Sequence, residues 1–320
     1  MAELAEKTEA ASAKGEVAGT PAVKTVELTK RFGHTVALAG LSMTVPRGEV
    51  FGFLGPNGAG KTTAVKLLLG LLKPTSGEGW LLGRPVGDLK TRSHIGYLPE
   101  LFRYQGWLSA AEVLALHCEL APLPRSSWRD EISSALETVG LTDRAGDKVS
   151  TFSKGMQQRL GLGAALVGEP ELVFLDEPTS ALDPVGRHDV REIIRGLASR
   201  GTAVFLNSHL LSEVEQVCDR VAVVDHGRVI ASGTMDELLG GTTVRVRAAG
   251  LTQADKNRLS SFGRMDDEGD QMTFASLDAD RVPELVASIV SMGGRVYEVA
   301  PRHQTLEDRF LQLLEDEETD

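Results

Sequence analysis

The sequence is poor in cysteine and has no long hydrophobic run, and both absences limit the class of protein. Cys118 and Cys218 are the two cysteines among 320 residues. This number suits a reducing cytosol, where each is expected to be a small buried apolar residue. No uninterrupted apolar stretch approaches the roughly 18 residues that cross a bilayer. Any work at a membrane would therefore need a separate membrane-spanning chain.

Positive charge is also scarce. The chain has 34 Lys and Arg against 45 Asp and Glu, a formal net charge of −11. An acidic chain is poorly suited to bind a polyanion, so no nucleic acid is expected as a partner. The same balance argues against a polybasic patch for anionic lipid.

What the sequence does contain is a glycine-rich loop that ends in Lys-Thr-Thr. Residues 55–63 fit the pattern G-x-x-x-x-G-K-[ST]. The apolar run 50–54 predicts a buried strand before the loop, and 64–69 predicts a helix after it. Glycines let backbone N–H groups surround an anion, and the helix N-terminus adds partial positive charge. The expected phosphate contacts are Gly55, Pro56, Asn57, Gly58, Ala59, Gly60, Lys61, Thr62 and Thr63.

Within this loop two side chains have specific expected roles. Lys61 should reach the β- and γ-phosphates of a nucleotide, where it would act in catalysis as well as in binding. The hydroxyl of Thr62 should ligate Mg²⁺. The loop therefore predicts ATP or a related nucleotide as ligand, with Mg²⁺ as cofactor.

A second apolar run ends in two carboxylates. Residues 172–175 predict a buried parallel strand that delivers Asp176 and Glu177 to the carboxyl edge of a sheet. We expect Asp176 to hold the Mg²⁺ shell and Glu177 to polarise an attacking water. The alternative is a helix N-cap followed by a solvated charge.

Residues 153–160, SKGMQQRL, lie shortly before that strand and resemble the signature motif of ABC ATPases. Ser153 offers a hydroxyl, Gly155 allows close backbone approach and a helix is expected to begin there, so the motif is a second anion cradle. The resemblance, which covers 26–233, implies that this cradle, with Gln157, holds the γ-phosphate of ATP bound to a second copy of the chain.

The same resemblance implies the fold. It is an α/β P-loop NTPase of ABC type, with a RecA-like core sheet, an antiparallel β subdomain and a helical subdomain. The helical subdomain is expected to include a helix opened by the capping box 109–112 and another over 128–139.

Other family landmarks follow in order. By resemblance, 180–183 is the loop that crosses the dimer interface and ends at Asp183. His209, at the end of the predicted strand 203–206, is the switch histidine that contacts the γ-phosphate and is assigned to catalysis. Phe32 is the aromatic that stacks on adenine, although a role in the core is the alternative.

Glu100 departs from the broad family pattern, because many ABC ATPases carry glutamine there. Either side chain offers an oxygen to Mg²⁺, but Glu adds a charge. The Leu-Pro-Glu form resembles the type 2 ABC exporter subgroup, which moves drugs, lipids or polysaccharides outward. The alternative is that Glu100 is a solvated loop residue.

An apolar and aromatic cluster follows Glu100. Its members are Leu101, Phe102, Tyr104, Trp107 and Leu108. One interpretation is a surface that contacts a partner. The other is that these side chains fill the core of the helical subdomain.

Three parts of the chain are expected. Residues 1–23 form a disordered tail that is no secretory signal, 24–240 form the ATPase domain, and 241–320 form a small α+β accessory domain with an acidic tail. A ferredoxin-like arrangement is favoured for the accessory domain, with strands near 244–247, 272–277 and 296–299, helices over 251–262 and 282–292, and a last helix capped at Thr305. Packing or dimer support and regulation are its two candidate roles.

The resemblance finally implies a function. The chain is expected to be the cytoplasmic ATPase subunit of an ABC exporter, attached to the inner face of the cell membrane through a separate transmembrane permease. A head-to-tail dimer of two copies would complete both nucleotide sites. The alternative is a soluble ABC ATPase that acts as an assembly or mechanical factor. A non-hydrolysing regulatory subunit would lack Glu177 or Ser153, and both are present.

Overall fold

The computed structural model describes residues 19–180, 182–239, 243–275, 277, 279–302 and 305–319. The chain forms two compact units, with the boundary between Ser232 and Gly233. The expected disorder of the N-terminal tail falls largely on residues 1–18, which lie outside the described residues, as does position 181 in the predicted dimer loop.

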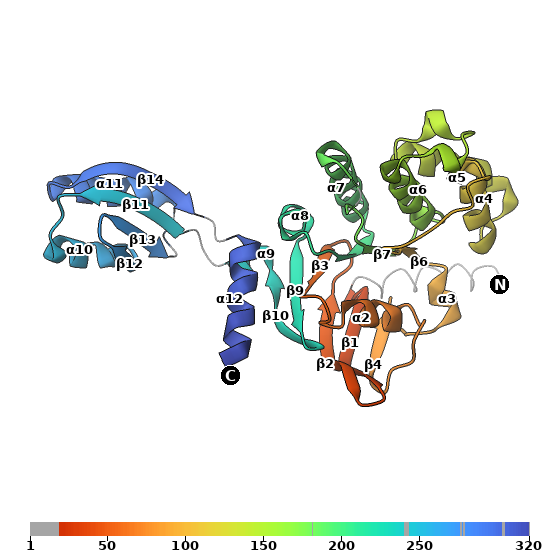
Figure 1. Ribbon diagram of the computed structural model, residues 1–320, viewed down its shortest axis with the longest axis horizontal. Helices are drawn as coiled ribbons and strands as arrows, with labels where there is room; N and C mark the ends of the chain where they lie inside the picture. The colour runs from red at the N-terminus through yellow and green to blue at the C-terminus, as the bar shows by residue number, and fades with distance from the viewer. Residues whose placement is uncertain are drawn as a thin grey trace, which may run out of the picture. The chain divides into compact units, whose positions relative to one another are not determined.

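The centre of the first unit is a six-stranded sheet with strand order β10-β9-β3-β8-β7-β6 (Figure 1). Its strands are β3 (Val50–Leu54), β6 (Ile95–Leu98), β7 (Leu172–Asp176), β8 (Ala203–Asn207), β9 (Arg220–Asp225) and β10 (Arg228–Thr234). The pairs β3–β8, β3–β9, β6–β7 and β7–β8 are parallel. Every residue of β3, β7 and β8 is buried, as expected for parallel strands covered on both faces. The two strands predicted around the sequence motifs are confirmed.

A second sheet of the first unit has strand order β2-β1-β4-β5. It consists of β1 (Val23–Phe32), β2 (Thr35–Val45), β4 (Ser76–Leu81) and β5 (Arg84–Pro85), paired antiparallel. Leu38 and Leu41 of β2 belong to the same buried core as Phe51 and Phe205 of the central sheet. The rings of Phe51, Phe53 and Phe174 all lie within 5.8 Å of the Phe205 ring. The expected antiparallel β subdomain is confirmed, and it packs on the nucleotide-binding core.

Helices complete the first unit. They are α2 (Lys61–Leu68), α3 (Leu89–Arg92), α4 (Ala110–Leu120), α5 (Trp128–Thr138), α6 (Lys154–Leu166), α7 (Pro184–Ser199) and α8 (Leu211–Val217). Helices α4, α5 and α6 pack together (Figure 1). The predicted capping box opens α4, because Glu112 accepts from the N–H of Ser109 at 2.7 Å and Ser109 Oγ accepts from the N–H of Glu112 at 3.3 Å. The helical part of the predicted fold is therefore present.

The second unit contains a four-stranded antiparallel sheet with order β12-β13-β11-β14. In chain order its elements are α9 (Met235–Leu239), β11 (Thr243–Ala249), α10 (Gln253–Leu259), β12 (Arg264–Glu268), β13 (Gln271–Ala275), α11 (Val282–Ser291), β14 (Arg295–Arg302) and α12 (Leu306–Thr319). From β11 to β14 this is the ferredoxin-like split βαβ arrangement. Helix α9 and strand β12 were not predicted, and the other elements were.

One face of this sheet carries the core of the second unit. Val244, Val246, Met272 and Phe274 point to that face and are fully buried with residues of α10 and α11. Helix α12 packs against α9 and begins at the predicted cap, where Thr305 Oγ1 accepts from the N–H of Asp308 at 3.1 Å. The opposite face of the sheet holds the alternate residues of each strand, which are largely polar.

Candidate functional site

The phosphate loop joins β3 to α2 and needs glycine at two points. A Cβ on Gly55 would lie 2.2 Å from the carbonyl oxygen of Val224, and one on Gly60 would lie 2.3 Å from that of Ala37. Gly60 also has φ of +98°, in the left-handed region. The loop is therefore pressed against neighbouring backbone, with its N–H groups preceding the N-terminus of α2.

Lys61 lies over this loop. Its Nζ donates to the carbonyl oxygens of Gly55 at 2.7 Å and Pro56 at 3.0 Å. Burial lowers the pKa of Lys61, while the nearby charges of Glu177 and Asp176 oppose that shift. The structure thus brings together the loop lysine and both predicted carboxylates.

Asp176 ends β7 and is buried at the edge of the sheet. Burial raises the pKa of its carboxyl, opposed by the hydrogen bond from Asn207, and the charges of Glu100 and Glu177 raise it further. Asn207 Nδ2 donates to Asp176 Oδ1 at 2.6 Å. Glu100 is exposed on the loop after β6. Two carboxylates beside Asp176 make this edge strongly negative, and a cation would relieve their repulsion.

The donor set can be compared with what Mg²⁺ requires. Asp176, Glu100 and the Thr62 hydroxyl are hard oxygen donors of the type that Mg²⁺ prefers. Among the described residues, no three His, Cys, Asp or Glu side chains are close enough to form a metal site by themselves. This fits Mg²⁺, which usually keeps waters and substrate phosphates in its shell and takes only one or two carboxylates.

Glu177 has an unusual backbone. Its φ is +53°, in the left-handed region that residues other than glycine rarely adopt. Its N–H donates to the carbonyl of Asn207 at 2.8 Å, and its own carbonyl accepts from Gln158 Nε2 at 3.3 Å and Ser180 Oγ at 3.1 Å. Three neighbours therefore hold the strained residue in place.

The side chain of Glu177 is held as well. Its Oε1 accepts from the backbone N–H of His209 at 2.9 Å and lies 2.8 Å from His209 Nδ1. Ser208 Oγ lies 3.5 Å from Oε2. The carboxylate is buried, whereas the imidazole of His209 is 60% exposed. The pair combines a fixed carboxylate with a ring that solvent or a ligand can reach.

The signature loop, residues 153–157, begins α6 and faces a different part of the surface. Ser153 Oγ accepts from the N–H of Met156 at 3.2 Å, and Gln157 Nε2 donates to the carbonyl of Phe152 at 3.2 Å. Asp183 caps α7 and accepts from the N–H of Gly186 at 2.8 Å. Ser153, Gly155 and Asp183 are among the residues that line an open cavity of about 440 Å³.

The structure does not join the two predicted anion sites. Among the described residues, no hydrogen bond or ion pair connects the signature loop to the phosphate loop. The link that does exist runs from Gln158 of α6 to the Glu177 carbonyl. A single chain thus carries one phosphate loop and one signature loop, and no hydrogen bond or ion pair joins them among the described residues.

Phe32 lies at the end of β1 and is 49% exposed. Lys30 Nζ lies 5.0 Å from the centre of its ring. The ring is therefore outside the core and its surface is available for stacking, so the alternative of a core role is wrong.

Three polar residues of the site were missed from the sequence. They are Gln158, Asn207 and Ser208, which hold the backbone or side chains of Asp176 and Glu177. Asn207 and Ser208 directly precede His209, and polar residues at the end of an apolar strand were an available signal. Gln158 is a buried polar residue within a helix, and only its contact with Glu177 reveals its role.

The apolar cluster after Glu100 is divided between surface and core. Leu101 is 87% exposed and Trp107 is 72% exposed. The rings of Phe102 and Tyr104 pack at 5.3 Å, Tyr104 also meets His117, and burial raises the pKa of Tyr104 to about 12. Tyr104 is therefore half-buried and packed within the helical subdomain, whereas Leu101 and Trp107 lie on the surface.

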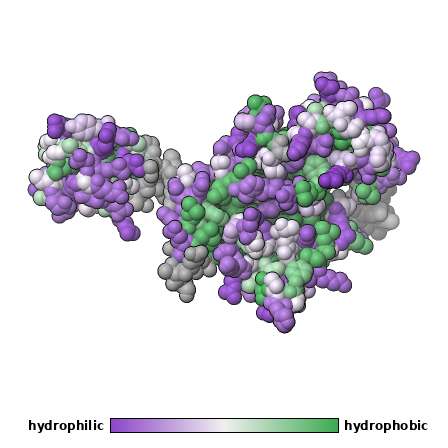
Figure 2. Space-filling view, in the orientation of Figure 1, coloured by the Kyte–Doolittle hydropathy of each residue, from purple (hydrophilic) through white to green (hydrophobic). Residues whose placement is uncertain are grey.

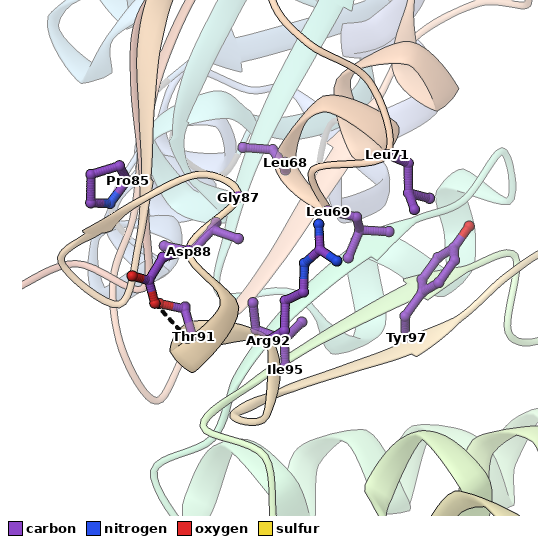
Figure 3. Close-up of a pocket in the computed structure, with 11 residues that line it drawn as sticks. Leu68, Leu69, Leu71, Pro85, Gly87, Asp88, Thr91, Arg92, Ile95 and Tyr97 are labelled. Carbon is purple, nitrogen blue, oxygen red and sulfur yellow. Dashed lines mark hydrogen bonds between the residues drawn. The ribbon is translucent and has the colours of Figure 1, made fainter. Parts of the chain in front are cut away.

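An apolar pocket of about 200 Å³ lies at the C-terminal end of α2 (Figure 3). Leu69, Leu71, Ile95 and Tyr97 are among its lining residues, and Leu71 is exposed at the surface. Arg92 extends along this pocket in Figure 3. Because Tyr97 is in β6 and Leu71 follows α2, an occupant would touch the elements that carry Glu100 and the phosphate loop.

Comparisons with known proteins agree with this geometry. A family model described as ABC transporter matches residues 38–180. An uncharacterized ABC transporter ATP-binding protein of Nostoc is 42% identical over 288 residues, which cover 89% of this chain and 85% of that protein. The daunorubicin resistance ATP-binding protein DrrA3 of Streptomyces coeruleorubidus is 39% identical over 90% of this chain and 94% of its own.

A solved structure is also similar. It is a dimeric ATP-binding cassette in a post-hydrolysis state bound to ADP and Pi, with a TM-score of 0.61 and 25% identity over 67% of this chain and 98% of that one. In the part of this chain that the structure describes, no helix combines the length and the apolar character needed to cross a membrane. The chain belongs to the ABC transporter family, as an ATP-binding subunit whose ATP hydrolysis drives transport.

Proposed function

We propose that this chain powers an ABC exporter and that Glu177 is the catalytic base of its ATPase. The observation that carries the catalytic assignment is the fixed carboxylate of Glu177, held by His209 and Ser208 beside Asp176 and Lys61. A base acts efficiently when its position is set before the reaction. Glu177 would accept a proton from the attacking water, and His209 would contact the γ-phosphate.

The phosphate loop would bind the nucleotide. The backbone N–H groups of residues 57–63 and the Lys61 ammonium would bind the phosphates, so that phosphate oxygens replace the two carbonyls that Lys61 now contacts. Phe32 would stack on adenine. Thr62, Asp176 and Glu100 would hold Mg²⁺, which supplies charge neutralisation of the phosphates when bound.

We propose that two copies assemble head to tail. The separation of signature loop and phosphate loop within one chain supports this arrangement, because each composite site then takes one loop from each copy. Ser153, Gly155 and Gln157, with Asp183 nearby, would act on the nucleotide of the partner. The similar cassette that was solved as a dimer supports the assembly of two copies.

The transmembrane permease is the second proposed partner, and through it the chain would lie on the cytoplasmic face of the membrane. Support comes from the exposed Leu101 and Trp107 and from the apolar pocket beside Leu71. Exposed apolar side chains around a pocket are typical of partner surfaces. Export is favoured by the relatives named for resistance to linearmycin and daunorubicin.

Affinity purification from a mild detergent tests this function. A tagged full-length chain is expected to copurify with a membrane protein of several spans, and the complex should hydrolyse ATP faster than the subunit alone. The matched control is the same chain with Lys61→Ala, which should retain the membrane partner but lack activity. An active chain that copurifies only with non-membrane proteins would favour the alternative of an assembly or mechanical factor.

A further inference from the structure

The open face of the ferredoxin-like sheet has a regular charge pattern. Asp266 of β12, Thr273 of β13 and Arg245 of β11 form one cross-strand row. Glu268, Gln271 and Arg247 form the next row of the same face. Each row therefore runs acid, neutral, arginine across three neighbouring strands.

These charges do not neutralise one another within the unit. Strands β12 and β11 are separated by β13, so their side chains are about 9.6 Å apart, too far for an ion pair. In the described part of the chain, no hydrogen bond or ion pair involves the side chains of Asp266, Glu268 or Arg245. Arg245 Nε is in addition shielded from solvent without an acceptor. Arg247 lies 3.7 Å from Glu298.

We propose that this face binds the same face of a second copy of the chain, about a two-fold axis that runs along β13. That axis places β12 of each copy over β11 of the other. Asp266 then meets the partner's Arg245, and Glu268 meets the partner's Arg247, while Thr273 and Gln271 lie on the axis. A two-fold interface must be self-complementary, and the row pattern meets that condition in both rows.

The polarity and the area of the face indicate the condition under which two copies would bind through it. The described side chains of the open face are largely polar, and Figure 2 shows a predominantly hydrophilic visible surface for this unit, so charge pairing rather than apolar burial would provide specificity. With this axis three strands of about five residues overlap, which gives a contact face of roughly 240 Å², well below the roughly 800 Å² per partner of a stable interface. The contact therefore needs the high effective concentration that a dimer of the ATPase units provides. The proposed contact rests on the proposed function in one respect, which is that the ATPase dimer brings the two faces together.

A cysteine on the axis tests the contact in the full-length chain. Thr273→Cys chains that also carry Glu177→Gln should crosslink to one another with a short bis-maleimide when ATP holds the dimer closed. Asn257→Cys is the matched control, because it is exposed on α10, on the opposite side of the sheet. The native Cys118 and Cys218 are buried and should not react.

Two arms separate the failure of the contact from the failure of the ATPase dimer. Mass photometry with ATP reports the dimer, and crosslinking is repeated without ATP at about 1 mM chain, a concentration comparable to that within a tethered pair. Crosslinking at Thr273 above the Asn257 level, in either arm, supports the contact. A closed dimer without such crosslinking overturns the contact alone. Absence of both a dimer and crosslinking overturns both proposals.

Charge reversal gives a sharper test. One variant carries Asp266→Lys and Glu268→Lys, and the other carries Arg245→Glu and Arg247→Glu. Each should crosslink with itself at least about tenfold less than the parent, because every pair becomes repulsive. A mixture of the two restores every pair, so crosslinks should form between unlike chains, and 1 M NaCl should suppress them. Unchanged self-crosslinking, or no gain on mixing, would overturn the assignment. The same charge reversals placed in the chain that keeps Glu177 should hydrolyse ATP at the parent rate, which checks that both variants fold.

Discussion

The two units of the molecule treat their charged side chains in opposite ways. At the edge of the central sheet, Asp176 and Glu177 are buried, and neighbouring groups fix each carboxylate. On the open sheet of the second unit, Asp266 and Glu268 are exposed and have no partner in the described chain. Charges that are buried and held in place suit chemistry, while charges left unpaired on a flat face suit recognition. Four experiments test how far this contrast between held and exposed groups extends.

The largest effect is expected from removing the charge of a held group. Glu177→Gln should slow steady-state ATP turnover by about 10²- to 10⁴-fold, because the general base is lost while the phosphate loop is intact. ATP should still bind and should trap a stable dimer. Turnover assays and size-exclusion chromatography with ATP measure the two effects. Near-normal hydrolysis would contradict the assignment of Glu177.

The second experiment separates the two anion cradles. Lys61→Ala removes a cation from the phosphates and should weaken ATP binding roughly 10- to 100-fold, and Ser153→Arg should block the signature loop. Each alone should be nearly inactive. In an equal mixture, half of the dimers would have one intact site of two, so about a quarter of wild-type activity should return. A disulfide between cysteines at position 153 and in the phosphate loop of one monomer would refute the trans arrangement.

The third experiment measures the cost of burying Asp176. Its folded-state pKa is raised by burial, so ionisation opposes folding once the pH exceeds the unfolded value of about 3.9. Without Mg²⁺ or nucleotide, Asp176→Asn should therefore raise the melting temperature at pH 7 by about 2–5 °C. The gain should shrink as the pH falls towards 4, and activity should be lost. A variant less stable than the parent at pH 7 would contradict this account.

The smallest effect on hydrolysis is expected from exposed apolar groups. Leu101→Ser with Trp107→Ser should leave the basal ATPase rate of the isolated subunit within about twofold, since neither side chain contributes to the core. The same variant should no longer copurify with the permease. Tyr104→Ala is the contrasting control, because loss of a packed ring should lower the melting temperature. Full permease binding by the double variant would locate the contact elsewhere.

The sequence predicted the structure correctly wherever a motif requires a particular backbone geometry. Residues 55–63 could be placed between a strand and a helix because glycines, an apolar run and Lys-Thr fix that geometry locally. The capping boxes at Ser109 and Thr305 were predicted for the same reason. The ferredoxin-like order was also expected, from the alternation of short strands and helices in the C-terminal part.

The features that were missed depend on contacts between distant segments. Strand β12, Arg-Met-Asp-Asp-Glu, has only one apolar residue and no alternation that would reveal a strand, because its partner β13 supplies the order. The division of the aromatic cluster, with Tyr104 packed and Trp107 exposed, depends on how α4 and α6 lie beside it. Asn207 and Gln158 gain their roles only when folding brings them to Asp176 and Glu177.

The hydrogen bond from Gln158 to the Glu177 carbonyl has a consequence for timing. In a head-to-tail pair, each chain gives Glu177 to one nucleotide and Ser153 to the other. Gln158 lies on α6, the helix that Ser153 caps, and its Nε2 donates a hydrogen bond to the Glu177 carbonyl oxygen at 3.3 Å. In such a pair, a displacement of the signature helix as one site releases its product would be transmitted within a single subunit to the proposed base of the other site. Product release at one site would then alter the rate of hydrolysis at the other without being required for it.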